Sequence, residues 1–325
     1  MSFSAGRIAK GVLFRVVPSL VILGLFELGL RVADQPKWDA CWIQKENFWA
    51  QDPELGFTYR PGSVVVKAKI NERGLRGPLL PQAKPEGTKR ILFIGDSTCF
   101  GLAVKLKDSF AVRSTALLQA VDPQHKYEYV IGALPGYSSY HSRIMLEHLL
   151  PMQPDLVVFY VGAHNDHSRA RYYPDGDIAQ RVARRAAAWH QVHLLQLLEN
   201  LRDRSCKSLF CKLKPRVEQA RVPPAAFREN MTAMLERTRV AGAQVLVLLP
   251  PYSKYLLEDH PTIPLYQQVL EETAREFGVA YVKLQETFAN YDEEKLYLKD
   301  MFHFRELGHE VTARAITAAV AGSEF

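Results

Sequence analysis

The chain has 325 residues, of which 47% are hydrophobic and 23% are charged, so it holds ample material for a packed core. This composition excludes an intrinsically disordered protein and allows one large domain with appendages or two small domains. The formal net charge is +6 and the pI is about 9.0. Because Lys and Arg are spread along the chain rather than gathered into one block, the charge argues against nucleic-acid binding.

The N-terminal residues determine the expected location. Three basic residues precede an apolar run over residues 16–30, and the stretch 11–33 is long enough to cross a bilayer. A basic flank favours an N-in orientation, so we expect residues 1–33 to form a cytoplasmic tip and a single-pass anchor in a bacterial inner membrane. The rest of the chain then faces the periplasm or the cell exterior. A buried amphipathic helix and a cleaved signal peptide are the alternatives, and Arg31 disfavours cleavage near Ala33.

Residues 34–88 contain many Pro, Gly, Trp and Tyr residues and lack a long periodic run. They are predicted to form an irregular lead-in that wraps the core and ends in a turn-rich segment.

A regular alternation follows, and residues 89–325 are predicted to form the main domain. Five short apolar runs have the length of strands buried on both faces. They lie at residues 90–94, 127–131, 156–161, 245–249 and 280–284, and helical patterns separate them at 110–120, 139–149, 227–241, 265–277 and 308–321. This order predicts an α/β fold, a three-layer sandwich around a five-stranded parallel sheet.

A long connection, residues 167–224, interrupts this alternation and is expected to be a lid or a partner surface. It holds a helix-like stretch at 178–201 and then Cys206 and Cys211, which are close enough for a small-loop disulfide in an oxidising compartment. Whether they are bonded stays open. The four cysteines lack the paired spacing of a zinc site.

Reactive residues follow the first three predicted strands, where the carboxyl ends of a parallel sheet build ligand sites. Ser97 follows the first strand on a sharp turn, either as a nucleophile or as a helix cap. Gly136 follows the second, either as an amide donor to an oxyanion or as an ordinary turn glycine. Asn165 follows the third, and its side chain either donates to the same oxyanion or forms an Asx turn.

A carboxylate and an imidazole precede the last predicted helix. The spacing of Asp300 and His303 lets the carboxylate fix the imidazole tautomer while the other ring nitrogen faces a serine. His309 is a competing base, but it lies inside the predicted helix and has no acid at that spacing. Together these four sites predict a serine hydrolase, because each follows a separate predicted element at one edge of the sheet. They are Ser97, Gly136, Asn165 and the Asp300–His303 pair.

The four blocks, in order, resemble those of the SGNH, or GDSL, hydrolases. They read Gly95-Asp96-Ser97, Gly136, Gly162-x-x-Asn165-Asp166 and Asp300-x-x-His303, and the resemblance covers about residues 88 to 322. It implies a flavodoxin-like sheet and a catalytic triad in which Ser97 attacks the acyl carbonyl, His303 is the base and then the acid, and Asp300 orients His303. It implies an oxyanion hole formed by the amides of Ser97 and Gly136 and the side chain of Asn165. It implies no metal, cofactor or nucleotide.

Two features qualify the resemblance. Many relatives have Asn shortly before the second-block glycine, whereas this chain has Gly132-Ala133-Leu134-Pro135 there. His164, beside Asn165, is expected to line the pocket or to be structural.

Two further stretches, residues 27–31 and 71–77, resemble a bacterial, membrane-anchored branch of this family.

The expected function is an esterase that hydrolyses O-acyl esters, with acetyl as the expected group, on an extracytoplasmic carbohydrate or related substrate. One alternative is an O-acetyltransferase that passes the acyl group to a polysaccharide together with a membrane acyltransferase partner. Others are a lysophospholipase or thioesterase, and a non-catalytic envelope scaffold that uses the connection 167–224 as its surface.

Overall fold

The structure is a computed structural model that describes residues 5–33, 48–168, 174–180, 192–195, 219–257 and 260–321. The chain divides into two compact units. The smaller unit comprises residues 1–47 and 179–216, and the larger unit comprises residues 48–178 and 217–325. Most of the predicted helix at 178–201 and the loop that holds Cys206 and Cys211 lie outside the described residues.

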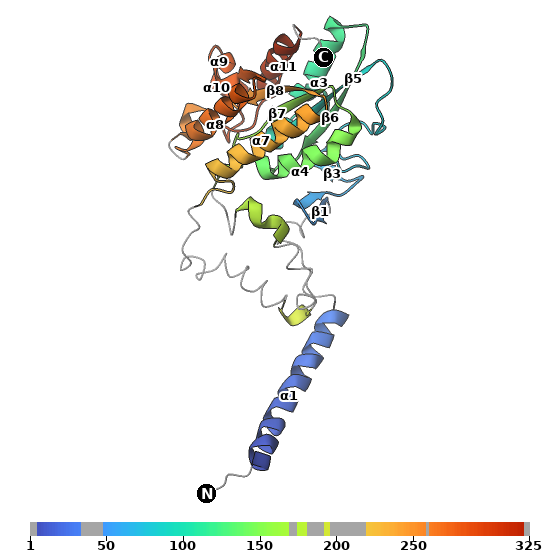
Figure 1. Ribbon diagram of the computed structural model, residues 1–325, viewed down its shortest axis with the longest axis vertical. Coiled ribbons are helices and arrows are strands. Elements are labelled where there is room, and N and C mark those ends of the chain that lie inside the picture. The colour runs from blue at the N-terminus through green and yellow to red at the C-terminus, as the bar shows by residue number, and fades with distance from the viewer. Residues whose placement is uncertain are drawn as a thin grey trace. The chain divides into compact units, whose positions relative to one another are not determined.

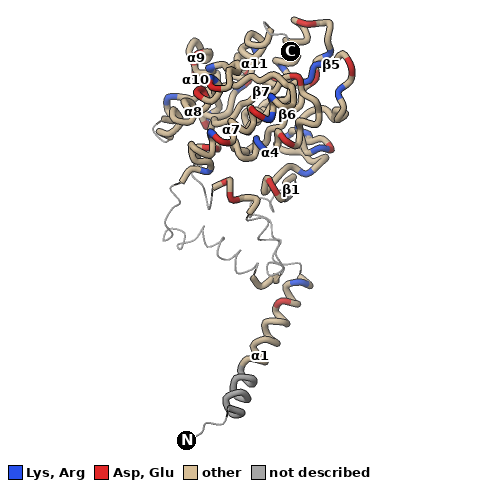
Figure 2. Tube along the Cα trace, viewed as in Figure 1, with Lys and Arg blue, Asp and Glu red and all other residues tan. Residues whose placement is uncertain are grey.

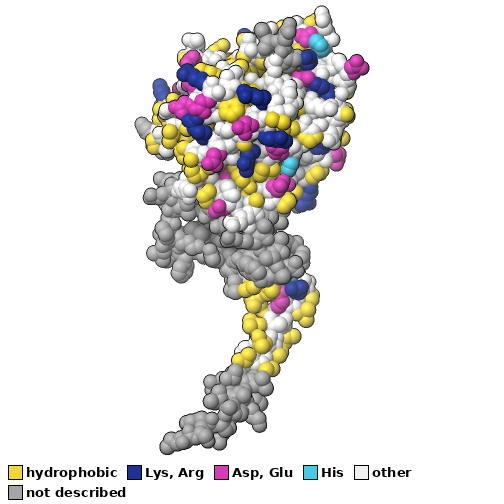
Figure 3. All heavy atoms as spheres, viewed as in Figure 1, with side chains coloured by type: hydrophobic (Ala, Val, Ile, Leu, Met, Phe, Trp, Pro, Cys, Tyr) yellow, Lys and Arg dark blue, Asp and Glu magenta, His cyan; other side chains and the backbone are white. Residues whose placement is uncertain are grey.

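The smaller unit contains one long helix, α1 (Ala5–Val32). From Val16 onward most of its apolar side chains are exposed, and Figure 3 shows them along the described part of the helix. The Glu27 carboxylate accepts hydrogen bonds from the Arg31 side chain and from the backbone N–H groups of His193 and Leu194. Among the described residues, no helix is both long enough and apolar enough to span a bilayer. The expected anchor at residues 11–33 stays a prediction.

The larger unit is built on one sheet, in which all five predicted strands are present. They are β5 (Thr88–Gly95), β6 (Lys126–Ala133), β7 (Leu156–Tyr160), β8 (Gln244–Leu249) and β9 (Ala280–Lys283). The order is β6-β5-β7-β8-β9, with every neighbouring pair parallel. The central strands are apolar without alternation because both faces are covered; for example, Phe93 and Val158 are each 0% exposed. The predicted five-stranded parallel sheet is confirmed.

Helices cover both faces of this sheet (Figure 1). On one face α3 (Phe110–Val121) packs against α11 (Glu306–Val320). On the other face α7 (Pro224–Val240) packs between α4 (Ser139–Leu149) and α8 (Ile263–Glu276). The helices that follow the neighbouring strands β5 and β7 thus lie on opposite faces. This reversal opens a crevice at the carboxyl ends of those two strands, where α/β proteins bind their ligands.

Short elements complete the larger unit. They are α2 (Ser97–Phe100), α9 (Leu284–Phe288), α10 (Glu293–Leu296), η1 (Leu106–Asp108), η2 (Leu150–Met152), η3 (Asp175–Asp177) and η7 (Lys254–Leu256).

The lead-in is more ordered than expected, and from Phe48 onward it belongs to the larger unit. It forms two antiparallel pairs, β1 (Trp49–Asp52) with β2 (Gly56–Tyr59) and β3 (Val64–Val65) with β4 (Ala68–Lys69). The Tyr137 hydroxyl donates to the carbonyl oxygen of Phe57, and the buried Arg76 guanidinium donates to three carbonyls just after Ser97. These contacts tie the lead-in to the crevice.

Charges of both signs are interspersed over the larger unit (Figure 2). Many of the arginines are paired, including the buried Arg90 with Glu128 and the surface residue Arg237 with Glu147.

Candidate active site

Ser97 stands at the turn between β5 and the short helix α2 (Ser97–Phe100). A side chain at Gly95 would collide with the carbonyl oxygen of Tyr160, so only glycine fits at the end of this strand. The helix is capped by Asp96, whose carboxylate accepts the N–H of Thr98 at 2.9 Å. Because Asp96 provides this cap, the hydroxyl of Ser97 is available for another contact.

That contact is with His303. The Nε2 atom of His303 lies 2.8 Å from Oγ of Ser97, and its Nδ1 atom lies 2.7 Å from Oδ2 of Asp300. The other oxygen of Asp300 accepts the backbone N–H groups of Phe302 and His303, each at 3.0 Å. Partial burial acts to raise the pKa of Asp300, but the hydrogen bonds from His303 and Phe302 lower it below its ordinary value. The ionised carboxylate accepts Nδ1–H, so the lone pair of Nε2 faces the serine.

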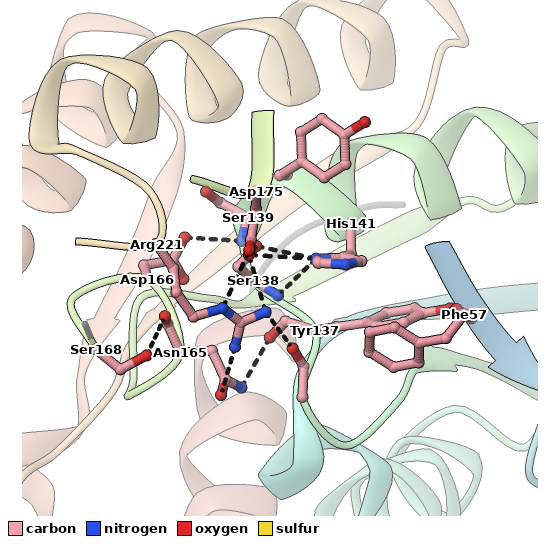
Figure 4. A network of polar contacts seen from close by, with 12 residues as sticks. Phe57, Tyr137, Ser138, Ser139, His141, Asn165, Asp166, Ser168, Asp175 and Arg221 are labelled. Carbon is pink, nitrogen blue, oxygen red and sulfur yellow. Dashed lines mark hydrogen bonds and ion pairs between the residues drawn. The ribbon is translucent and has the colours of Figure 1, made fainter. Parts of the chain in front are cut away.

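Gly136 and Asn165 lie together after β6 and β7. Gly136 has a left-handed φ of 89°, and a β-carbon there would lie 3.4 Å from the ring of Phe57. The Nδ2 group of Asn165 donates to the carbonyl oxygen of Tyr137 at 2.9 Å, as Figure 4 shows. The side chain of Asn165 is therefore oriented toward the turn that carries Gly136.

Arg221, which no sequence motif predicted, contacts both Gly136 and Asn165. Its guanidinium donates to the carbonyl oxygen of Gly136 at 2.8 Å. It also donates to Oδ1 of Asn165 at 3.2 Å and pairs with Asp175 at 2.8 Å (Figure 4). Asp175 also accepts the hydroxyl hydrogen of Ser138 at 2.7 Å. Arg221 and Asp175 lie near the two ends of the connection 167–224, where no motif marks them, so no local signal was available to find them.

Asp166, the last residue of the third block, joins two segments near the site. It is buried and accepts the backbone N–H of Ser139, the first residue of α4, at 2.8 Å. Burial raises the pKa of Asp166 to about 6, against the hydrogen bonds from Ser139 that lower it. Asp166 thus connects the loop after β7 to the start of α4.

His309, the competing base of the sequence analysis, lies in the core. Its side chain is buried within α11, and Nδ1 accepts the backbone N–H of Phe110 at 3.2 Å. Burial lowers the pKa of His309 to about 3, so the ring stays neutral. Its ring contacts Phe110 of α3 and Phe304, which is the environment of a structural histidine.

Three further histidines gather beside this site. One ring nitrogen from each of His164, His167 and His260 lies within 4.8 Å of the others, a set that has the donor type to hold a metal ion. The ring of His164 packs against Phe302 with centroids 3.8 Å apart, one residue from His303. His164 therefore lies beside the candidate active site. Its spacing from His167 is a local signal, whereas His260 is brought in by the fold.

The chain is similar to a known family in sequence and to solved proteins in structure. Residues 93–311 match the GDSL-like lipase/acylhydrolase family. A lipase/acylhydrolase from Enterococcus faecalis has a similar structure at 16% identity, with a TM-score of 0.50 over 72% of this chain and 96% of that one. At this identity the likeness shows the fold alone. An acetylxylan esterase from Geobacillus stearothermophilus, Axe2, is 18% identical, with a TM-score of 0.49 over 73% of this chain and 95% of that one. No curated protein matches the chain.

Proposed function

Since the chain belongs to the GDSL-like lipase and acylhydrolase family of ester-acting hydrolases, we propose that it is a serine esterase with Ser97, His303 and Asp300 as its triad. The observation that carries this proposal is the hydrogen-bonded series from Ser97 through His303 to Asp300, with links of 2.8 and 2.7 Å. A serine hydroxyl needs such a base, and the base needs an anion behind it, for attack on an ester at neutral pH.

The proposed reaction has two halves. Oγ of Ser97 attacks the acyl carbonyl while Nε2 of His303 takes its proton, and Asp300 stabilises the imidazolium that forms. His303 then returns the proton to the leaving alcohol oxygen, and an acyl ester on Ser97 remains. Water attacks this ester with His303 again as the base, which releases the acid and restores the serine.

The negative charge on the carbonyl oxygen needs donors in fixed positions. We assign this role to the amides of Ser97 and Gly136 and to the Nδ2 group of Asn165. One such donor typically contributes about 3 kcal/mol to transition-state stabilisation. The contacts of Arg221 with Gly136 and Asn165 support this assignment, because one planar cation holds both donors in register.

The acyl group is proposed to be short, with acetyl as the first candidate. Support comes from Phe57, whose ring lies 3.4 Å from the position that a β-carbon on Gly136 would take. An aromatic wall beside a proposed oxyanion donor leaves less room for a long chain. Replacing Phe57 with Ala is expected to raise activity on butyryl and longer esters relative to acetyl esters. An unchanged chain-length profile would contradict the short-acyl assignment.

The alcohol is proposed to be a carbohydrate outside the cytoplasm, with the basic N-terminal flank directing the larger unit there. The proposed location rests on the sequence. The alternative reaction, transfer of the acyl group to a polysaccharide with a membrane acyltransferase partner, also rests on the sequence. Protease accessibility of the full chain in intact cells and spheroplasts tests the location. Full protection of the larger unit in spheroplasts would contradict it.

The proposed nucleophile is tested on the full chain with a fluorophosphonate probe and p-nitrophenyl acetate. Ser97→Ala is expected to abolish labelling and to lower kcat by at least about 10⁴-fold. Ser114→Ala is the matched control, because its hydroxyl donates to the Ala111 carbonyl of its own helix. Labelling that persists in Ser97→Ala would overturn the assignment. Slow hydrolysis combined with fast acetyl transfer to an added oligosaccharide would identify a transferase instead.

A further inference from the structure

A cluster of three histidines lies at the carboxyl end of β7. His164 and His167 follow that strand three positions apart, and His260 comes from the segment between η7 (Lys254–Leu256) and α8 (Ile263–Glu276). Their ring centroids are 5.2 to 5.5 Å apart in all three pairs, and one ring nitrogen of each lies within 4.8 Å of the others. Three imidazoles that converge on one point from two segments form a metal-ligand set.

Two ring nitrogens in this cluster have no hydrogen-bond partner among the described residues. Nε2 of His167 lies 3.0 Å from the carbonyl oxygen of Ala163, and since a carbonyl only accepts, Nε2 carries the hydrogen. Nδ1 of His167 is then a lone-pair acceptor, and it is buried and has no hydrogen-bond partner among the described residues. Nδ1 of His164 is also buried and has no partner there. The whole His167 residue is 6% exposed. A buried polar atom without a partner is costly, and a bound cation would remove that cost.

The cluster also has the surroundings of a metal site. Metal-binding histidines usually donate their other ring N–H to a carbonyl or carboxylate, as His167 does to Ala163. The positive charge of Arg221 acts on His164, and Asp175 balances this charge at 2.8 Å from Arg221.

We propose that His164, His167 and His260 bind a divalent transition-metal ion, with zinc as the favoured ion. Zinc takes three histidine nitrogens at about 2.0–2.1 Å and leaves a fourth position open, which sets the nitrogens about 3.4 Å apart. From the present separation of up to 4.8 Å, each nitrogen would move by roughly 1 Å toward their common centre to reach this spacing. The proposal does not depend on the esterase activity proposed above.

The position of the cluster gives the metal a structural consequence. Phe302 packs against His164 at 3.8 Å and against His260 at 5.6 Å, measured between ring centroids. Its backbone N–H donates to Asp300, and the next residue is His303. A metal that ties His164 to His260 therefore stiffens the segment on which the Asp300 and His303 side chains depend.

The test uses the full chain, stripped of metal with a chelator and titrated with Co²⁺ and then Zn²⁺. We expect one saturable equivalent, the intense visible bands of cobalt in a tetrahedral site, displacement of cobalt by zinc, and a higher melting temperature with zinc. His260→Gln and His167→Gln are each expected to weaken binding by about 100-fold or more. His148→Gln is the matched control, because its side chain is 46% exposed and pairs with Glu54.

Two results would overturn the proposal. One is the absence of saturable binding to the wild-type chain, a measurement that needs no variant to fold. The other is undiminished binding in His260→Gln. Asp300→Asn separates this site from the Ser97–His303 pair: the cobalt bands should persist in it, and their loss would place the metal on the proposed triad instead.

Discussion

The guanidinium of Arg221 lies 2.8 Å from the carbonyl oxygen of Gly136 and donates to it. The same group reaches Asn165 and Asp175, so one residue from the end of a long connection links the loops that follow β6 and β7. Its side chain is only 20% exposed, which strengthens these charge-assisted contacts.

Arg221→Lys is expected to lower kcat on p-nitrophenyl acetate by about 10 to 100-fold with little change in KM, because one ammonium cannot hold three acceptors in a plane. Arg228→Lys is the control, since Arg228 pairs at the surface with Glu272 and Glu276. A variant that loses stability but keeps kcat would mean that Arg221 has only a structural role.

Asp300→Asn is expected to lower kcat by about 10³ to 10⁴-fold, because an amide in place of the carboxylate favours the wrong imidazole tautomer. The chain offers a matched control in Asp122, which contacts His125 at the same spacing and the same distance of 2.7 Å. Asp122→Asn should leave kcat unchanged. Equal losses in both variants would indicate a general effect on folding.

Gly136→Ala is expected to destabilise the protein by about 1 kcal/mol, because its φ of 89° is unfavourable for alanine, and to reduce kcat sharply. Gly278→Ala carries the same backbone cost at a φ of 63°, with no atom within 4 Å of the added carbon. Urea unfolding and kinetics on both variants separate the two effects. Full activity in Gly136→Ala would remove Gly136 from the proposed oxyanion hole.

His309→Gln is expected to keep esterase activity and to change how stability depends on pH. Burial lowers the pKa of His309 from 6.5 to about 3, so on acidification the unfolded chain takes up a proton that the folded chain does not. Between pH 7 and pH 5 this costs the wild type about 2 kcal/mol of stability, and the cost is absent in the variant. Stability therefore rises with pH across this window.

The measurement for His309 is the free energy of urea unfolding at pH 5 and pH 7 for both proteins. Burial raises the pKa of Asp96 to about 6 and that of Asp166 to about 6, and these shifts act in the opposite direction. They are common to both proteins, so the difference between the proteins isolates His309. A difference that is independent of pH would contradict the assignment, and a loss of activity would return His309 to the list of candidate bases.

Much of the larger unit follows from local patterns. Strands buried on both faces must be apolar at every position, so runs such as 90–94 and 156–161 identify the sheet, and the intervening helical patterns make it parallel. Parallel strands end at one edge. The positions of Ser97, Gly136 and Asn165 after successive strands therefore already bring them to the same edge, and the Asp300–His303 pair is local in sequence.

What the local patterns left open was decided by contacts between distant segments. The sequence allows Ser97 to be a nucleophile or a helix cap, and in the structure Asp96 caps the helix instead. His309 is excluded as the base because it is buried against α3. The lead-in gains strands because it pairs with itself and packs on the core. No local pattern marks Arg221 as a partner of Gly136 or brings His260 to His164. Pairings of this kind depend on how the whole chain packs, and periodicity and spacing carry no information about them.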